Sequence, residues 1–227
     1  MNHTIIQERE GINQFYAKIY GFVGLGIGIS AIVAALMLTS LSGVLQAVLL
    51  GNRVIYYGAI FLELALVFMA SNMAMKNSPA ALPLFLTYSA LNGFTMSFIV
   101  AMYTQQTVLA AFVSSALMFF VMAGLGMMVK KDLSGMGRAL TGALIGVLLA
   151  SLVNIFLQSS GLSYLISYIM VVIFAGLIAW DNQKIRLVYE QTNGQAGLGW
   201  VVSLALSLYL DFVNLFLSIL RILGRND

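Results

Sequence analysis

The sequence has no cysteine, one histidine and few charged residues. The lack of cysteine excludes disulfides, thiolate zinc sites and cysteine nucleophiles. The one histidine, His3, is close to the N-terminus, so we expect neither a histidine metal site nor a serine–histidine catalytic pair. Only 8% of the residues are charged, whereas soluble domains have about 25%. So few charges cannot cover a water-soluble surface, which excludes a cytosolic enzyme and a nucleic-acid-binding protein.

The apolar residues predict an all-α integral membrane protein. They make up 61% of the chain, and the mean hydropathy is +0.96. No charge occurs between Lys18 and Arg53, between Lys76 and Lys130, or between Arg138 and Asp181. These stretches are continuously apolar rather than alternating, which favours helices over a β-barrel.

The 227 residues are enough for seven transmembrane helices of about 20 residues each. We predict an N-terminal segment at 1–18, a transmembrane domain at 19–223 and a C-terminal tail at 224–227. The predicted spans lie near 19–42, 54–75, 81–103, 107–128, 138–158, 162–181 and 199–223.

The basic residues predict the orientation in the plasma membrane, because cytoplasmic loops are enriched in Lys and Arg. With a cytoplasmic N-terminus, eight of the eleven basic residues lie inside and three outside. We therefore expect a multi-pass protein with its N-terminal segment in the cytoplasm. An even number of spans would instead place Arg221 and Arg225 inside.

Three carboxylates fall within or next to the predicted spans. Glu63 is near the middle of the second span, Asp211 near the middle of the last, and Asp181 at the cytoplasmic end of the sixth. A charge at the bilayer centre costs about 2.5–3.5 kcal/mol on insertion scales, so such residues indicate a functional site. The alternatives are an interfacial helix end for Asp181, near Lys184 and Arg186, and a plain interhelical hydrogen bond for Glu63.

Polar residues recur along one face of the last predicted helix, at steps of three and four. They are Ser203, Ser207, Asp211, Asn214, Ser218, Arg221 and Arg225. A polar stripe of this length cannot face lipid, so it faces the bundle interior or a wet cavity. It is either a solute path or a structural hydrogen-bonding seam.

Asp181 and Asp211 can meet if the last helix enters the membrane near residue 204. Two desolvated carboxylates in contact cannot both ionise cheaply, so they share a proton. Such a pair responds to pH and can bind a divalent cation such as Ca²⁺ transiently, because that ion prefers oxygen ligands.

Small residues also recur at helical spacing in two of the predicted spans. Gly24 and Gly28 lie on the first span, and the fifth carries a longer face. That face consists of Gly142, Gly146, Ala150 and Asn154. Both faces predict close helix packing.

Three segments of the chain resemble the transmembrane Bax inhibitor motif family. Phe174–Ile185, which contains Trp180-Asp181-Asn-Gln-Lys184, resembles the signature of its sixth helix. Ser207–Leu223 resembles its last helix, and Lys130–Arg138 resembles the loop before its fifth span. The small size and short loops are similar to those of bacterial members, which lie in the inner membrane.

This resemblance implies a seven-helix fold whose last helix is central among the other six. It also implies a pH-sensitive calcium leak in which Asp181 and Asp211 share a proton and gate the path, with Ca²⁺ as the permeant ion and no cofactor. Glu63 matches an acidic residue of the family's second helix, and Trp180 stands where the family has tyrosine.

The family's second helix also carries an arginine that latches onto the aspartates. No basic residue occurs here between Glu63 and Lys76, so Lys76 and Arg221 are the candidate latches.

The leading hypothesis is thus a proton-gated cation leak, not an enzyme. Its path would be lined by Glu63, Ser203, Ser207, Asn214 and Ser218, and its partners would be the lipid bilayer, calcium ions and protons. The second hypothesis is an interaction protein that modulates a membrane protease or other membrane proteins, as some bacterial relatives do.

A remote third hypothesis is an intramembrane aspartyl protease, which would use the two aspartates to activate water. In those enzymes a Gly-x-Gly run precedes the second aspartate, and here Tyr209-Leu210 precedes Asp211. The proline motif that follows that aspartate is also missing.

Overall fold

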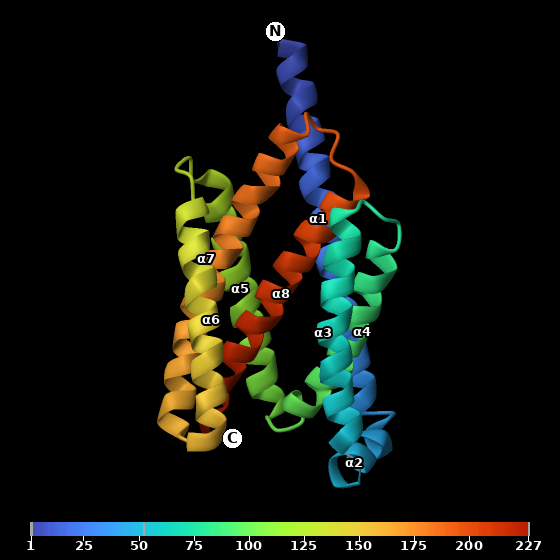
Figure 1. Cartoon of the computed structure of the whole chain (residues 1–227), viewed down its shortest axis with the longest axis vertical. Coiled ribbons are helices and arrows are strands. Elements are labelled where there is room, and N and C mark those ends of the chain that lie inside the picture. The colour runs from blue at the N-terminus through green and yellow to red at the C-terminus, as the bar shows by residue number, and fades with distance from the viewer. Residues whose placement is uncertain (1, 52, 227) are drawn as a thin grey trace. The chain divides into compact units, whose positions relative to one another are not determined.

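The computed structural model describes the backbone of residues 2–51 and 53–226, and the side chains of residues 11–51 and 54–225. Every regular element in these ranges is helical (Figure 1), which confirms the predicted all-α class. The helices are α1 (Asn2–Leu38), α2 (Ser42–Leu50), α3 (Arg53–Met75), α4 (Ala81–Val100), α5 (Gln105–Met128), α6 (Ser134–Leu157), α7 (Ser160–Gln191), α8 (Leu198–Leu223) and the 3₁₀ turn η1 (Gly224–Asn226).

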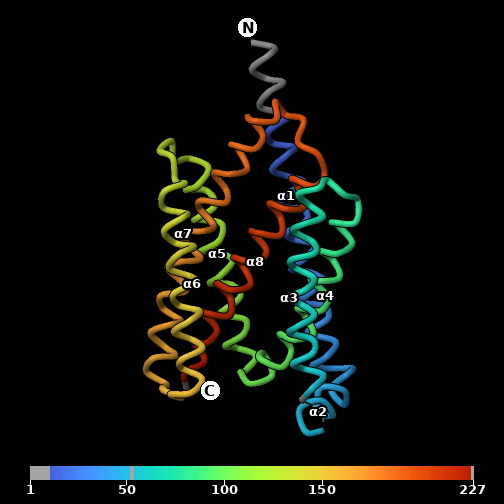
Figure 2. Tube along the Cα trace, viewed as in Figure 1, coloured from blue at the N-terminus to red at the C-terminus, as the bar shows by residue number. Residues whose placement is uncertain are grey.

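Within the described ranges, seven helices are long and apolar enough to cross a membrane, as the charge-free stretches predicted. The short helix α2 was not predicted, because the chain turns at 39–41 within an apolar run that gives no hydropathy signal. Two other bounds differ: α1 already begins at Asn2, and α7 continues to Gln191 (Figure 2) rather than ending near 181. Hydropathy locates the membrane, whereas a helix can continue into water.

The chain divides into two compact units. Unit 1 comprises residues up to Met102 and Val188–Tyr209, and unit 2 comprises Tyr103–Leu187 and residues from Leu210 onward. In unit 1, α1 and α3 both pack against α4. Helices α7 and α8 each contribute one part to each unit.

In unit 2, phenylalanines and small residues bring the helices together. Phe112 and Phe119 of α5 make edge-to-face contacts with Phe212 of α8. At Gly126 of α5, an added Cβ would lie 2.1 Å from the backbone oxygen of Ala179, so α5 and α7 touch backbone to backbone there. Small residues allow this close approach.

Gln183 ties α7 to the loop between α5 and α6. Its side-chain amide donates to the carbonyl oxygens of Val129 (3.2 Å) and Lys131 (2.8 Å), and its oxygen accepts from the backbone N–H of Leu133 (2.7 Å). In the same loop, the backbone N–H of Ser134 donates to Asp132 and holds its pKa below the usual range. The loop is thus held by the helix that carries Asp181.

Helix α8 is the most enclosed of the seven spans. In its most apolar 18-residue window 72% of the residues are buried, against 6–44% in the other spans. A helix covered to this extent has neighbours on most sides, which is consistent with the expected central position.

The glycines that were expected to pack closely are not the ones that do. A Cβ added at Gly24, Gly28, Gly142 or Gly146 would meet nothing within 4 Å. In the first span the contact belongs instead to Gly26, which faces Phe85 and Tyr209. Spacing alone does not reveal which face of a helix meets a neighbour.

We predict that Gly126→Ala destabilises the protein by about 1–3 kcal/mol, because the new methyl group would overlap the backbone of Ala179. The matched control is Gly124→Ala on the same helix, where the space is open and alanine is the better helix former. Unfolding in mixed detergent micelles measures both variants. Equal stability of the two would contradict a backbone contact at Gly126.

Gln183→Leu removes three hydrogen bonds and leaves their backbone partners unpaired, so we expect a loss of about 1–3 kcal/mol in unfolding free energy. Gln106→Leu is the control, because Gln106 is exposed at the start of α5. The same micelle unfolding assay applies. An unchanged Gln183→Leu protein would show that the loop is held by other contacts.

Candidate functional site

Asp181 lies within α7, not at its end. The helix continues for ten residues beyond it to Gln191, and the Asp181 side chain is buried. The residues that follow Asp181 are polar yet good helix formers, and the positive φ angles that end the helix occur only at Asn193 and Gly194. Asp181 is therefore not at the end of a helix.

Lys184 forms an ion pair with Asp181. Its Nζ lies 2.9 Å from Oδ1 of Asp181, three residues earlier on the same helix. The ammonium group also lies over the Trp180 ring, 4.0 Å from its centroid. An aromatic face attracts a cation, so the ring holds the lysine where it can neutralise Asp181.

The structure brings Asp211 of α8 into the same environment. Its carboxylate interacts electrostatically with both Asp181 and Lys184, all three residues being part of unit 2. Asp211 is 6% exposed, and its Oδ2 is buried with no hydrogen-bond partner among the described residues. A buried carboxylate oxygen without a partner is costly, so this atom needs a proton or a cation.

Of the two candidate latches, Arg221 lies away from this position. Arg221 is ten residues after Asp211 on α8, about 15 Å along the helix axis, and it lines a cavity described below. Lys76 is exposed in the turn after α3 and belongs to unit 1. The basic residue beside the aspartates is Lys184, and its three-residue spacing from Asp181 was the signal in the sequence that could have identified it.

The polar stripe of α8 is buried at some positions and accessible at others. Ser203, Ser207 and Asn214 are half-buried and Arg221 is exposed, whereas Asp211 and Ser218 are buried. Ser203 also lines a cavity of about 370 Å³ in unit 1. This pattern decides neither for a solute path nor for a structural seam.

Two stripe residues also bond to their own helix. Ser218 donates to the carbonyl oxygen of Asn214, and Asn214 donates to that of Leu210, each at 2.7 Å. These bonds satisfy the donors without a neighbouring helix. For Ser203 and Ser207, no hydrogen bond is recorded within the described part of the chain.

Glu63 belongs to a hydrogen-bonded network in unit 1. The hydroxyl group of Thr95 donates to the Glu63 carboxylate, which also bonds to the Asn92 side chain. The Tyr209 hydroxyl donates to Oδ1 of Asn92 at 2.9 Å and bonds to Oγ of Ser30 at 2.6 Å. The interhelical hydrogen bond considered for Glu63 is therefore present, and it is part of a network across α1, α3, α4 and α8.

Sequence reasoning missed Tyr209, Thr95 and Ser30 in this network. Their partners lie on other helices, up to 179 residues away along the chain. The polar Asn92 within an apolar span indicated that a buried hydrogen bond was needed there. The sequence alone did not identify the residues that bond to it.

The aspartate pair offers few of the oxygen ligands that a resident calcium ion needs. The described residues contain no cluster of three or more His, Cys, Asp or Glu side chains. Calcium sites in proteins supply about six to eight oxygen ligands, whereas the pair provides two carboxylates, one of which is held by Lys184. The free oxygen of Asp211 fits a transient contact with a divalent ion.

Comparison with known proteins agrees with this architecture. The model of a protein family described as Inhibitor of apoptosis-promoting Bax1 matches residues 12–227. An uncharacterized membrane protein of Streptococcus pyogenes serotype M1 is 57% identical over 229 residues, covering 100% of both chains. Protein YrjE of Lactococcus lactis is 45% identical, covering 98% of this chain and 96% of its own. Inner membrane protein YbhL of Escherichia coli is 42% identical with the same coverage. The chain therefore belongs to the Bax inhibitor-1 family and is a membrane protein with multiple transmembrane helices.

Proposed function

We propose that the protein is a passive, pH-sensitive cation leak, with Ca²⁺ as the permeant ion and Asp181 and Asp211 as the gate. The proposal rests on one observation, the oxygen atom Oδ2 of Asp211, which is buried and has no hydrogen-bond partner among the described residues. The Asp211 carboxylate also interacts electrostatically with Asp181 and Lys184, which form an ion pair. Membership of the family supports the same reading. In this proposal the chain lies in the plasma membrane with a cytoplasmic N-terminus and has no catalytic role.

The net charge of the three groups explains the response to pH. Asp181, Asp211 and Lys184 together carry −1 when both carboxylates are ionised, and zero when one proton is bound. Helix α5 has no ionisable side chain and α6 has only Arg138, whereas α7 carries a second basic residue near the pair, Arg186. A change of one charge in a buried site is a large electrostatic event. Protonation therefore alters both the attraction for a cation and the contacts of α8.

The route would follow the polar stripe of α8. Ser203, Ser207, Asn214 and Ser218 offer oxygen atoms along one face, and oxygen is the ligand that Ca²⁺ prefers. Glu63 lies in the network that includes Tyr209, so it would act by positioning α8 rather than by holding the ion.

We expect calcium flux into dye-loaded liposomes carrying the purified protein to depend on pH when it is measured from about pH 5 to about pH 8, because binding one proton changes the net charge of the site. Asp211→Asn mimics the protonated carboxyl group. It should hold the flux at the wild-type low-pH level throughout. Asp132→Asn is the matched control, because Asp132 is exposed in the loop before α6.

If both Asp211→Asn and Asp181→Asn kept the wild-type pH profile, the two aspartates would not be the gate. If the flux did not exceed that of empty liposomes at any pH, the protein would not be a leak, and an interaction with other membrane proteins would be favoured. Co-purification with a membrane protease would then be the measurement to make.

Lys184→Met should move the midpoint of the flux–pH curve to higher pH. The reason is that the two carboxylates would then hold their proton without a neighbouring positive charge. Lys130→Met removes the same charge from an exposed position and serves as control. Equal midpoints in the two variants would mean that Lys184 does not take part in gating.

A further inference from the structure

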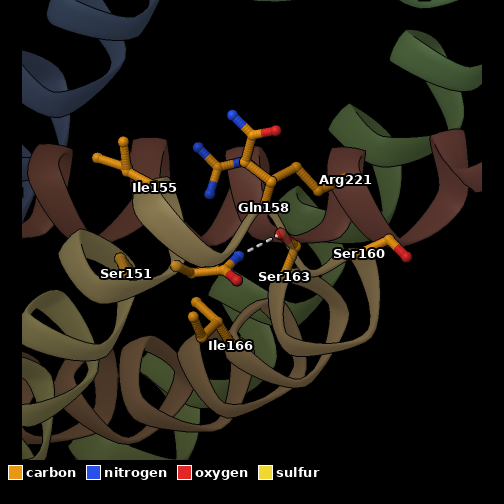
Figure 3. Close-up of a pocket in the computed structure, with 8 residues that line it drawn as sticks. Ser151, Ile155, Gln158, Ser160, Ser163, Ile166 and Arg221 are labelled. Carbon is orange, nitrogen blue, oxygen red and sulfur yellow. Dashed lines mark hydrogen bonds between the residues drawn. The ribbon is translucent and has the colours of Figure 1, made fainter.

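Two cavities open beside Arg221, where α6, α7 and α8 come together at one end of unit 2. Figure 3 shows the residues that line the larger one. The larger has a volume of about 400 Å³ and the smaller about 270 Å³. They share the side chains of Ser160, Ser163 and Arg221. Arg221 is in the last turn of α8, which places its guanidinium group near the membrane–water boundary.

The larger cavity offers hydrogen-bond donors that the protein does not use. Arg221, Gln158 and the hydroxyl group of Ser160 line it, and none of these side chains has a recorded partner among the described residues. The other polar groups are already satisfied, since Asn154 donates to Ser163 at 2.7 Å. A ligand of this cavity therefore has to supply acceptors.

A second arginine lies at the same end of the described part of unit 2. Arg225 lies over the Tyr164 ring, 5.1 Å from its centroid, and Tyr164 lines the smaller cavity. The described carboxylates of the unit are distant. Asp211 is about 15 Å along α8 from Arg221, Asp181 about 30 Å along α7 from Ser160, and Asp132 precedes the opposite end of α6. The ligand is therefore an anion.

Part of the cavity wall is apolar. Ile155 and Ile166 line it together with the donors, and the neighbouring Phe156 is 88% exposed. An anionic head next to an apolar surface at the membrane boundary is the chemistry of a phospholipid. A guanidinium group matches a phosphate with two parallel hydrogen bonds.

We infer that this cavity binds a phosphate group, held by Arg221, Gln158 and Ser160, and that the apolar wall favours the headgroup of an anionic phospholipid over free phosphate. The site is separate from the aspartate pair and does not depend on the leak.

The test is native mass spectrometry of the protein purified from vesicles of phosphatidylglycerol and phosphatidylcholine. We expect the wild type to retain one phosphatidylglycerol in detergent. Arg221→Gln should lose at least about tenfold of that occupancy, because the guanidinium contact is worth more than a neutral one. Arg138→Gln, an exposed arginine at the other end of α6, should retain the lipid.

A second variant tests whether the lipid binds in the cavity or only contacts the Arg221 side chain in the headgroup layer. Ser151→Leu fills the larger cavity and leaves Arg221 intact, so it should also lose the lipid. Retention by Ser151→Leu, or equal loss in Arg138→Gln and Arg221→Gln, would overturn the proposal. A competition arm with inorganic phosphate distinguishes the two sources. Release of the lipid at millimolar phosphate would assign the site to the free anion and overturn the assignment to a lipid.

Discussion

A polar group at membrane depth has no water to bond to, and this constraint governs the whole molecule. The backbone satisfies it by being helical across every span. Serine and threonine side chains satisfy it by donating to carbonyl oxygens of their own helix, as Ser115 does to Ala111. The side chains that these local solutions do not cover fall into two groups. One is the Glu63–Asn92–Tyr209 network, and the other is the environment of Asp181 and Asp211.

The two groups solve the constraint differently. In the network, donors and acceptors alternate from Thr95 to Ser30, so each polar group has a partner. At the aspartates, Lys184 satisfies one carboxylate and leaves one oxygen of the other without a partner. The hydrogen-bonded network stabilises one packing of the helices. At the aspartates one carboxylate oxygen has no partner, so it depends on a proton or a cation from the surroundings.

The sequence predicted the membrane spans and the two aspartates, but not the contacts between helices. Apolar runs between charged or polar segments located all seven spans, because hydrocarbon excludes charge over a known thickness. The two aspartates were found because they interrupt or end such runs. Lys184 was placed near Asp181 only in the alternative of an interfacial helix end, because the predicted span ended at 181 and the lysine was assigned to a loop. The partners of Asn92 and the close contacts of Gly126 depend on which helix faces meet, and the pattern of one helix does not contain that information.

Tyr209 and Asp211 are two residues apart on α8, so they point to nearly opposite sides of one helix. The side of α8 that carries Tyr209 is held by hydrogen bonds to Asn92 and Ser30. A turn of this part of the helix would therefore have to break both hydrogen bonds, and their loss would slow any such movement.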